Sequence, residues 1–288
     1  MQIKVLTSVE EARSIVDDVA VLFRICFDRE LDHQRWAQYY FLNPYGDPLI
    51  TLGYSDDGVL IGHSGMVAQK LLANDGTEYP YCLSISLMVA PQHRGFANFY
   101  KLFSAAISAA RSRGVPFLLS FPNANSFLVL KHSFGWRELV ESELYDWQPD
   151  QPPLPTASIL PLERFRLGDE IVHPSDATYY QWRSYASPYQ AELVNDRLAI
   201  IYKLPDDGTL TVLDLQTEWP DCSSRDLGAL VTHTGAKRVR MSGVHARAAG
   251  FDLANITRCS DYRLRLCYLP LTSDPPPMRF SLLLSDIF

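Results

Sequence analysis

The chain has 288 residues, of which 47% are apolar and 20% are charged, a balance typical of globular proteins. This length is long for one compact α/β domain and comfortable for two. The formal net charge is −7 and no dense run of Lys and Arg occurs, so we expect no nucleic-acid partner. No stretch approaches the roughly 18 apolar residues that cross a bilayer. The N-terminus also lacks a signal-peptide pattern, so we expect a cytoplasmic protein without a membrane partner.

The cysteines give no sign of a disulfide framework or of a zinc site. None of them is paired at CxxC spacing, and their number is odd. The five residues are Cys26, Cys82, Cys222, Cys259 and Cys267. An odd and scattered set fits a reducing cytosol, and we therefore expect neither structural disulfides nor a bound metal.

The first 43 residues are predicted to be helical. Thr7 or Ser8 can cap a first helix, because acidic side chains follow in its first turn and apolar residues then recur at helical spacing up to Phe23. A second helix is expected over residues 30–41. It ends before the Asn43-Pro44 pair, since the residue before a proline disfavours the helical conformation.

Three strands joined by tight turns are predicted to follow, at residues 48–54, 59–72 and 79–89. The first turn ends in Asp57-Gly58, which is a hairpin signal, and Asp75-Gly76 makes the second turn. The third strand is rich in apolar residues on both faces, so we expect it at the centre of a sheet. Pro91 ends this strand.

A strong amphipathic helix is predicted at residues 97–113, where Phe99, Phe103 and Ile107 repeat at helical spacing. Gly114 can end this helix in a left-handed conformation. Three further elements complete the first half: a short buried strand at residues 116–121, a helix that Asn125 or Ser126 caps and that ends at Gly135, and a strand at residues 137–147.

A Pro-rich linker at residues 150–155 is the predicted domain boundary. It divides the chain into two domains, at residues 1–149 and 156–288. The second domain is the smaller of the two, and nothing in it matches residues 91–97 of the first.

The two halves nevertheless share features in the same order. Trp36-x-x-Tyr39 in the first half resembles Trp182-x-x-Tyr185 in the second, and Asp57-Gly58 is answered by Asp207-Gly208. Chance could give any one of these matches. Their shared order favours two domains of one ancestry.

The segment between the third strand and the amphipathic helix has the properties of a phosphate-binding loop. Pro91 stops the strand, Gly95 permits backbone torsions closed to other residues, and the helix begins at once. The first amides of that helix are unpaired and its dipole is positive there, which suits a pyrophosphate. An ordinary strand-to-helix turn, which also favours glycine, is the alternative. A P-loop and a dinucleotide fold fit poorly, because neither Lys-Ser/Thr nor a full GxGxxG is present.

The pattern Val89-x-Pro91-Gln92-x-x-Gly95-x-Ala97, followed by helix, strand, Asn, helix and Gly135-Trp136, resembles the GCN5-related N-acetyltransferase (GNAT) superfamily. The pyrophosphate loop of that family reads Gln/Arg-x-x-Gly-x-Gly/Ala. The resemblance covers about residues 1–147 and implies an α/β fold of the α+β type, a mixed twisted sheet flanked by helices. The second half resembles the smaller, degenerate GNAT-like α/β domain of two-domain bacterial members, often encoded with surface-polysaccharide genes.

The resemblance implies acetyl-CoA, or another acyl-CoA, as co-substrate. Its pantetheine arm would lie in a gap between the strands at residues 79–89 and 116–121. The implied cofactor-binding residues are Leu87, Met88, Val89, Gln92, His93, Arg94, Gly95, Phe96, Ala97, Asn98, Asn123, Asn125 and Ser126.

The implied reaction is direct acetyl transfer to the primary amine of a small molecule, with an amino sugar as one candidate. A base removes the amine proton, and a backbone amide near Val89 can polarise the thioester carbonyl. The alternative is a non-catalytic acyl-CoA-binding or regulatory module. The sequence leaves the oligomeric state open, a homodimer included.

Four residues are candidates for proton transfer, and three of them depart from the family pattern. Lys131 stands where the family usually has an acidic Tyr, and Ser84 and Ser86 stand where a carboxylate is common on the central strand. Water held by the two serines could relay a proton. His63 is a candidate base beside the expected substrate groove, and a hydrogen-bonded sheet histidine is the alternative interpretation. Lys131 is either a solvated helix residue or a contact to the cofactor.

Overall fold

The computed structural model describes residues 1–73, 75–149, 157–161, 177–185, 188–217 and 219–284. Its contacts divide the chain into two compact units that are interleaved in sequence. The first unit comprises Met1–Ser120, Phe134–Arg137 and Tyr268–Pro277, and the second comprises Phe121–Ser133, Glu138–Cys267 and Met278–Phe288. The predicted linker at 150–155 lies outside the described residues, so the domain limits 1–149 and 156–288 stay predictions.

The first unit begins with a strand that the sequence analysis missed. β1 (Gln2–Leu6) pairs antiparallel with β2 (Leu49–Tyr54), so the prediction of a wholly helical N-terminal region was wrong for these five residues. Its five residues alternate between exposed and less exposed side chains, and only Leu6 is fully buried. Such a short alternation is a weak signal for a strand in the sequence. The strand ends next to Ser8, whose hydroxyl caps the following helix by accepting from the Glu11 amide.

Three helices follow β1, in the region where helices were predicted. They are α1 (Val9–Ser14), α2 (Val16–Phe27) and α3 (His33–Tyr40). Asp32 caps α3 by accepting a hydrogen bond from the Arg35 amide at 3.0 Å, which sets the start of this helix.

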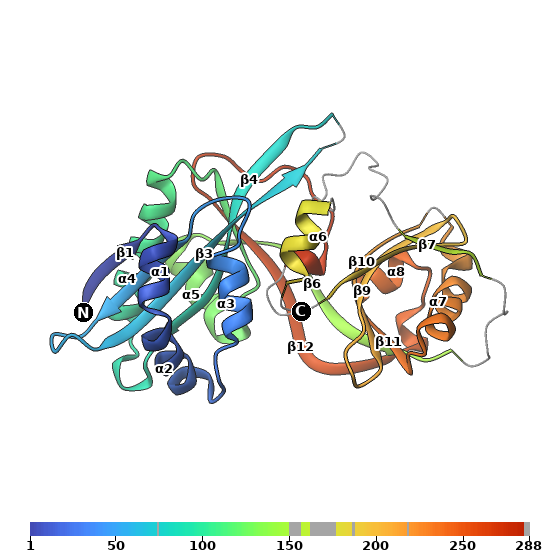
Figure 1. Ribbon diagram of the computed structural model, residues 1–288, viewed down its shortest axis with the longest axis horizontal. Coiled ribbons are helices and arrows are strands. Elements are labelled where there is room, and N and C mark those ends of the chain that lie inside the picture. The colour runs from blue at the N-terminus through green and yellow to red at the C-terminus, as the bar shows by residue number, and fades with distance from the viewer. Residues whose placement is uncertain (74, 150–156, 162–176, 186–187, 218, 285–288) are drawn as a thin grey trace. The chain divides into compact units, whose positions relative to one another are not determined.

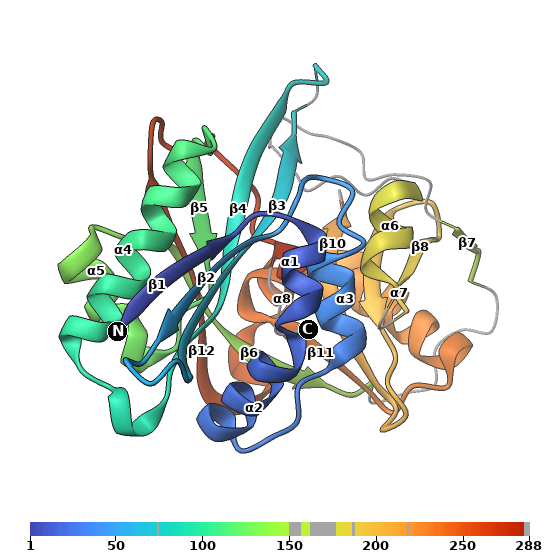
Figure 2. The ribbon, with the colours of Figure 1, turned by 60° about the vertical axis from the view of Figure 1, so that its left-hand side comes forward.

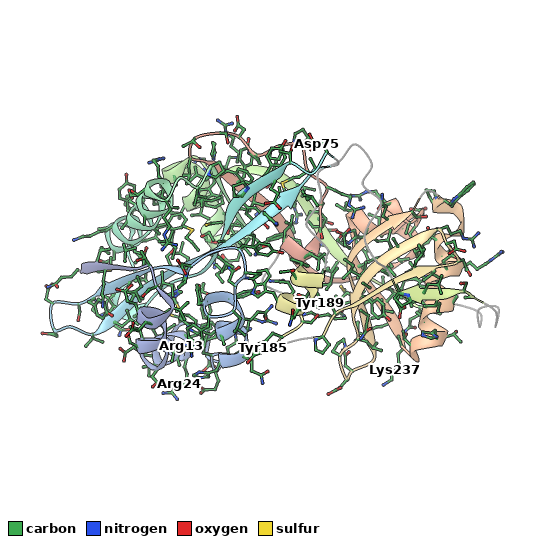
Figure 3. All side chains as sticks on the ribbon, turned by 45° about the horizontal axis from the view of Figure 1, so that its top comes forward. Arg13, Arg24, Asp75, Tyr185, Tyr189 and Lys237 are labelled. Atoms are coloured by element: carbon green, nitrogen blue, oxygen red, sulfur yellow. The ribbon has the colours of Figure 1, made fainter. Side chains whose placement is uncertain are left out.

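The sheet of the first unit confirms the predicted strands. It continues with β3 (Leu60–Leu72), β4 (Glu78–Val89) and β5 (Phe117–Ser120) in the order β1-β2-β3-β4-β5 (Figure 1 and Figure 2). β4 is central, because it pairs antiparallel with β3 and parallel with β5. Asp75 lies at the tip of the β3–β4 hairpin (Figure 3).

Helices cover both faces of this sheet (Figure 2). A side chain at Gly62 would meet Leu102 of α4 (Phe96–Ser112), whereas one at Gly65 would meet Tyr40 of α3. These two glycines lie three positions apart on β3, so they face opposite sides of the sheet. α4 confirms the predicted amphipathic helix, and the side chains it buries are Leu102, Phe103, Ala106, Ile107 and Ala110.

The second unit is built on the strand order β12-β6-β11-β10-β9-β8-β7. Its buried core includes Ile200, Leu210 and Leu230. The remaining elements of the chain are η1 (Pro91–His93), α5 (Ala124–Phe134), β6 (Arg137–Trp147), β7 (Ile159–Pro161), α6 (Ala177–Arg183), β8 (Gln190–Val194), β9 (Leu198–Lys203), β10 (Thr209–Thr217), α7 (Pro220–Thr234), β11 (Arg238–Ser242), α8 (Gly243–Ala248), η2 (Leu253–Asn255), β12 (Thr257–Pro270) and η3 (Leu282–Leu284).

The element order of the first unit recurs in the second. β8, β9, β10, α7 and β11 follow one another as β2, β3, β4, α4 and β5 do, and β10 and β11 pair in parallel as β4 and β5 do. The Asp207-Gly208 turn joins β9 to β10. It therefore corresponds to the Asp75-Gly76 turn, which joins β3 to β4. The predicted match with Asp57-Gly58, which joins β2 to β3, was wrong by one hairpin.

Ion pairs across neighbouring strands stabilise the second unit. Arg240 on β11 lies directly opposite Asp146 on β6, and its Nε and Nη2 each donate to one carboxylate oxygen of Asp146 at 2.8 Å. Arg238 lies 3.7 Å from the same carboxylate. A two-point Arg–carboxylate contact has a fixed geometry. It also costs less side-chain entropy per hydrogen bond than a contact through one hydrogen bond.

Replacing Asp146 tests this interaction. Asp146→Asn keeps the shape of the side chain but removes the charge that two arginines share, so we expect the free energy of unfolding to fall by about 2 kcal/mol. The control is Asp274→Asn, which breaks the 3.1 Å pair with Arg137, because those side chains are 64% and 60% exposed. Denaturant unfolding should show no measurable change for the control. Equal shifts in the two variants would contradict the account.

Candidate functional site

The parallel pairing of β4 with β5 is short. In the described chain it joins Cys82 to Leu118 and Leu83 to Leu119, whereas β4 continues to Val89. The hydroxyl of Ser120, the last residue of β5, donates to the Ser84 carbonyl at 3.2 Å. The residue pairs of β4 and β5 thus end before Ile85, and the gap for the pantetheine arm stays a prediction. The free edge of β4 can pair with an extended chain that carries amide groups.

A β-bulge re-aims β4 beside this edge. His63 on β3 pairs with Met88 and Gly65 pairs with Ile85, so Ser86 and Leu87 both lie opposite Ser64. Ser86 has a φ of 49°, which is uncommon for a residue with a Cβ atom. Bulges of this kind occur next to active sites, where they redirect backbone and side-chain groups.

The loop after β4 begins with a tight turn. The amides of His93 and Arg94 donate to the carbonyls of Ala90 and Pro91 at 2.8 and 3.3 Å. These two amides are thus already engaged within the turn, although the family resemblance implies His93 and Arg94 as cofactor-binding residues. The donors left at this end of the loop are those of Gly95 and of the first turn of α4.

Gly95 sets the geometry of the helix start. Its φ of 159° and ψ of 157° form a combination that is almost restricted to glycine. A Cβ atom there would meet no atom within 4 Å, so the backbone conformation, not crowding, requires glycine. Gly95 is the N-cap of α4 and provides no side-chain cap, so the amides of Phe96, Ala97 and Asn98 remain available to a ligand.

The electrostatics of this helix start favour an anion. The first turn of α4 contains no acidic residue, and the helix dipole is positive there. Arg94 donates from Nε to the Val89 carbonyl at 3.3 Å, and Asn98 donates from Nδ2 to the His93 carbonyl at 2.9 Å. These two contacts hold the loop against the end of β4. The arrangement is a phosphate site of the helix N-terminus type.

Two exposed aromatic side chains lie next to the loop. Phe96 and Tyr100 are 61% and 46% exposed, with ring centroids 5.5 Å apart, and Tyr100 stacks on Phe134 at 5.1 Å. Phe96 was a predicted site residue, and Tyr100 was not. The signal was available, since aromatic residues four apart at a helix start share one face.

His63 is fully buried. Its exposed fraction is 0%, and its Nδ1 lies 2.8 Å from the Ser86 carbonyl oxygen. A carbonyl only accepts hydrogen bonds, so Nδ1 carries the proton. Burial lowers the pKa of His63 to about 4, which keeps the ring neutral at physiological pH. This geometry fits a hydrogen-bonded sheet histidine better than a base open to substrate.

The structure does not bring His63 together with Ser84. His63 pairs across the sheet with Met88, and Ser84 pairs with Met66. His63 and Met66 are three positions apart on β3, so their side chains, and those of their partners, point to opposite faces. Ser84 is buried, and Ser86 within the bulge is half-buried. The serines stay candidates for a water relay, separate from His63.

The family now follows from comparison with known proteins. Residues 11–139 match the family model of the acetyltransferase (GNAT) domain. The chain therefore contains a GNAT acetyltransferase domain. No curated protein matches the sequence. The predicted fold, a mixed sheet flanked by helices, is confirmed by this match and by solved structures.

Three solved structures illustrate the likeness in fold. A GCN5-related N-acetyltransferase from Kribbella flavida shares 15% identity, with 94% of this chain and 72% of that chain covered, at a TM-score of 0.63. Eis1 from Mycobacterium abscessus shares 16% identity over 94% of this chain and 73% of that chain, at a TM-score of 0.57. A fungal β-N-acetylglucosaminidase with a glucosamine N-acetyltransferase region shares 11% identity over 93% of this chain and 38% of that chain, at a TM-score of 0.58.

Gln92 lies in η1 of the first unit and is exposed. Four predicted site residues, Asn123, Asn125, Ser126 and Lys131, belong to the second unit. Asn123, not Asn125 or Ser126, caps α5, because its Oδ1 accepts from the Ser126 amide at 3.0 Å. Asn125 is exposed. Lys131 is also exposed, with its Nζ 5.7 Å from the centre of the Phe127 ring. A contact of these four residues with the cofactor stays a prediction.

Two further expectations concern metals and membranes. Within the part of the chain that the structure describes, no cluster of three or more His, Cys, Asp or Glu side chains could hold a metal ion. None of the described helices has the length and apolar character that crossing a membrane requires.

Two buried histidines predict how stability depends on pH. Burial lowers the pKa of both His63 and His245 to about 4, below the ordinary value of 6.5. Their neutral forms therefore stabilise the fold fully above about pH 6.5, and this contribution is lost as the pH falls towards 4. In that window the unfolded chain binds up to two more protons, which gives a slope of about 2.7 kcal/mol per pH unit from the pair.

Denaturant unfolding at several pH values between 7.5 and 4.5 checks this expectation. His63→Asn removes one of the two buried titrating groups, so the slope from histidines should fall by about half relative to the wild type. Carboxylates titrate equally in both proteins and cancel in the comparison. A variant with the pH dependence of the wild type would contradict the assignment.

Proposed function

We propose that this GNAT domain transfers an acetyl group from acetyl-CoA to the primary amine of a small molecule. The observation that carries the proposal is the juxtaposition, in one short segment, of the free edge of β4 and the uncapped start of α4. CoA contains an extended arm with two amides and an anionic pyrophosphate. The strand edge suits the arm and the helix start suits the pyrophosphate.

The proposed reaction needs little side-chain chemistry. The amine nitrogen attacks the thioester carbon, the C–N bond forms, the C–S bond breaks, and the amine proton is lost as the thiolate is protonated. A backbone amide of β4 near Val89 would polarise the carbonyl oxygen. Ser84 and Ser86 are the proposed holders of a water relay, and Lys131 is a further candidate. Positioning of the two reactants supplies much of the rate.

An amino sugar is the proposed acceptor, and the protein is proposed to act in the cytoplasm without a nucleic-acid or membrane partner. The net charge of −7 favours a cationic amine over an anionic acceptor. The resemblance to a bacterial branch linked to surface polysaccharides supports the sugar. So does the likeness in fold to a glucosamine N-acetyltransferase region. The proposal leaves the oligomeric state open, a homodimer included.

A non-catalytic acyl-CoA-binding module is the second candidate. It is favoured by departures from the family pattern. Lys131 stands where the family usually has a Tyr, and Ser84 and Ser86 stand where a carboxylate is common. Release of free thiol from acetyl-CoA should separate the two candidates when amino sugars, polyamines and aminoglycosides are supplied as acceptors. We expect an N-acetylated amino sugar. A persistent blank with a protein that binds CoA would favour the module.

Substitution of Gly95 tests the cofactor site directly. Gly95→Asp places a carboxylate over the amides that would hold the pyrophosphate, and we expect the Kd for CoA to rise about 100-fold. The matched control is Gly114→Asp at the other end of α4, where a Cβ atom also meets nothing within 4 Å and φ is also positive. Calorimetric titration should show near-normal affinity for the control. Unchanged affinity in Gly95→Asp would remove the loop from the site.

A further inference from the structure

His63 is hydrogen-bonded to the backbone of β4, just beyond the last residue pair of β4 and β5. Its Nδ1–H donates to the Ser86 carbonyl at 2.8 Å, and the ring is 0% exposed. Water does not compete for this hydrogen bond, so it is stronger than the same contact at the surface. It joins a side chain of β3 to the residue at which β4 bulges.

Ser86 needs such support. Its φ of 49° places a residue with a Cβ atom in the left-handed region, which is unfavourable unless the surroundings impose it. The bulge also sets Ser86 and Leu87 against the single residue Ser64, so the regular β3–β4 ladder is interrupted at this point. The imidazole supplies a donor to the Ser86 carbonyl within this interruption.

The neighbours of His63 hold the ring in one orientation. A Cβ atom at Gly65 would collide with the Tyr40 hydroxyl oxygen and would lie 3.4 Å from Cε1 of His63. The Tyr40 hydroxyl therefore occupies the space that a side chain at position 65 would fill, beside the imidazole. The Trp36 ring lies 5.6 Å from His63. Packing at this density prevents the ring from turning towards a substrate.

The residues after the bulge are those whose backbone lies at the free edge. Leu87 and Val89 follow Ser86 beyond the last residue pair of β4 and β5. Because the Ala90 amide donates to Ile61 of β3, and backbone groups alternate along a strand, the amides of Leu87 and Val89 point away from β3 to the free edge. Groups along a strand alternate with a period of two, so loss of the one-residue bulge would turn these amides to the other side. Their direction thus depends on the bulge.

We propose that His63 is a positioning residue, which holds the β4 bulge through Ser86 and so aligns the amides of Leu87 and Val89 with the pantetheine arm. The inference rests on the proposed function, but it assigns His63 neither proton transfer nor contact with a ligand. The second unit has a comparable arrangement. β10 shifts register between Val212 and Asp214, and the Leu213 carbonyl accepts from the Ser281 hydroxyl at 3.4 Å.

A matched pair of substitutions isolates the donor. Asn and Leu have nearly the same shape, and both are smaller than the imidazole that they replace. Only Asn carries an N–H at the position of Nδ1. Binding of CoA is compared with binding of 3′-phosphoadenosine 5′-diphosphate, which has phosphates but no pantetheine arm. His63→Leu should weaken CoA about tenfold and leave the second probe unchanged, whereas His63→Asn should bind CoA within about threefold of the wild type.

Several results would overturn the inference. Equal CoA affinity in the Asn and Leu variants would show that the donor is irrelevant. Equal weakening of both probes in His63→Leu would indicate general damage to the domain. A wild type that binds neither probe would contradict the proposed function and this inference with it, so the two failures are distinguishable.

A measurement on the unsubstituted protein covers the case in which the variants do not fold. Long-range ¹H–¹⁵N NMR spectra identify which ring nitrogen of a histidine carries the proton. At pH 7, His63 should be the neutral Nδ1–H form, with a slowly exchanging proton. An Nε2–H form, or a ring that samples both forms, would overturn the proposal.

Discussion

Buried backbone N–H and C=O groups must find hydrogen-bond partners, and β4 meets this constraint differently along its length. Cys82 and Leu83 pair on both sides, with β3 and with β5. Among the described residues, the strand partner of Ile85 to Val89 is β3 alone, across a bulge. The chain then turns directly into α4, whose first amides also lack intrahelical acceptors. One short segment thus combines a strand edge and a helix start that both have amides open to a ligand, and the proposed function follows from that combination.

The second unit has the same element order without this combination. α7 follows β10 as α4 follows β4, but Pro220 occupies its first turn and has no N–H to offer. No glycine stands at the N-cap of α7, which is Trp219. Within the described residues, this helix start therefore lacks the glycine conformation and the full set of amides that favour an anion at α4. The difference lies in a few residues between strand and helix.

The elements that sequence predicted well are those with local signals. Residues 97–113 carry a long helical periodicity, and the Asp57-Gly58 turn marks its hairpin directly. β1 was missed because its five residues depend on pairing with β2, which lies more than forty positions away. The interleaving of the units is equally non-local, since Tyr268–Pro277 returns to the first unit.

The residues of the candidate site also fall into those that local sequence signals predict and those that depend on strand pairing. Glycine and proline mark the loop in the sequence, so Gly95 and the start of α4 could be found from the residues alone. The bulge could not, because a serine at 86 gives no signal for a left-handed conformation, and the bulge exists only in register with β3. The interpretation of His63 changed for this reason. A histidine flanked by glycines suggests a reactive group, and only the pairing reveals that its Nδ1–H is committed to Ser86.

Hydrogen–deuterium exchange with and without saturating acetyl-CoA tests the central claim most directly, because it reads the amides themselves. The account predicts slower exchange over residues 85–98, from the free edge of β4 through the first turn of α4. It predicts no change over residues 209–217 of β10, which have the same place in the second unit. Unchanged exchange over 85–98 at a concentration that saturates binding would contradict the account.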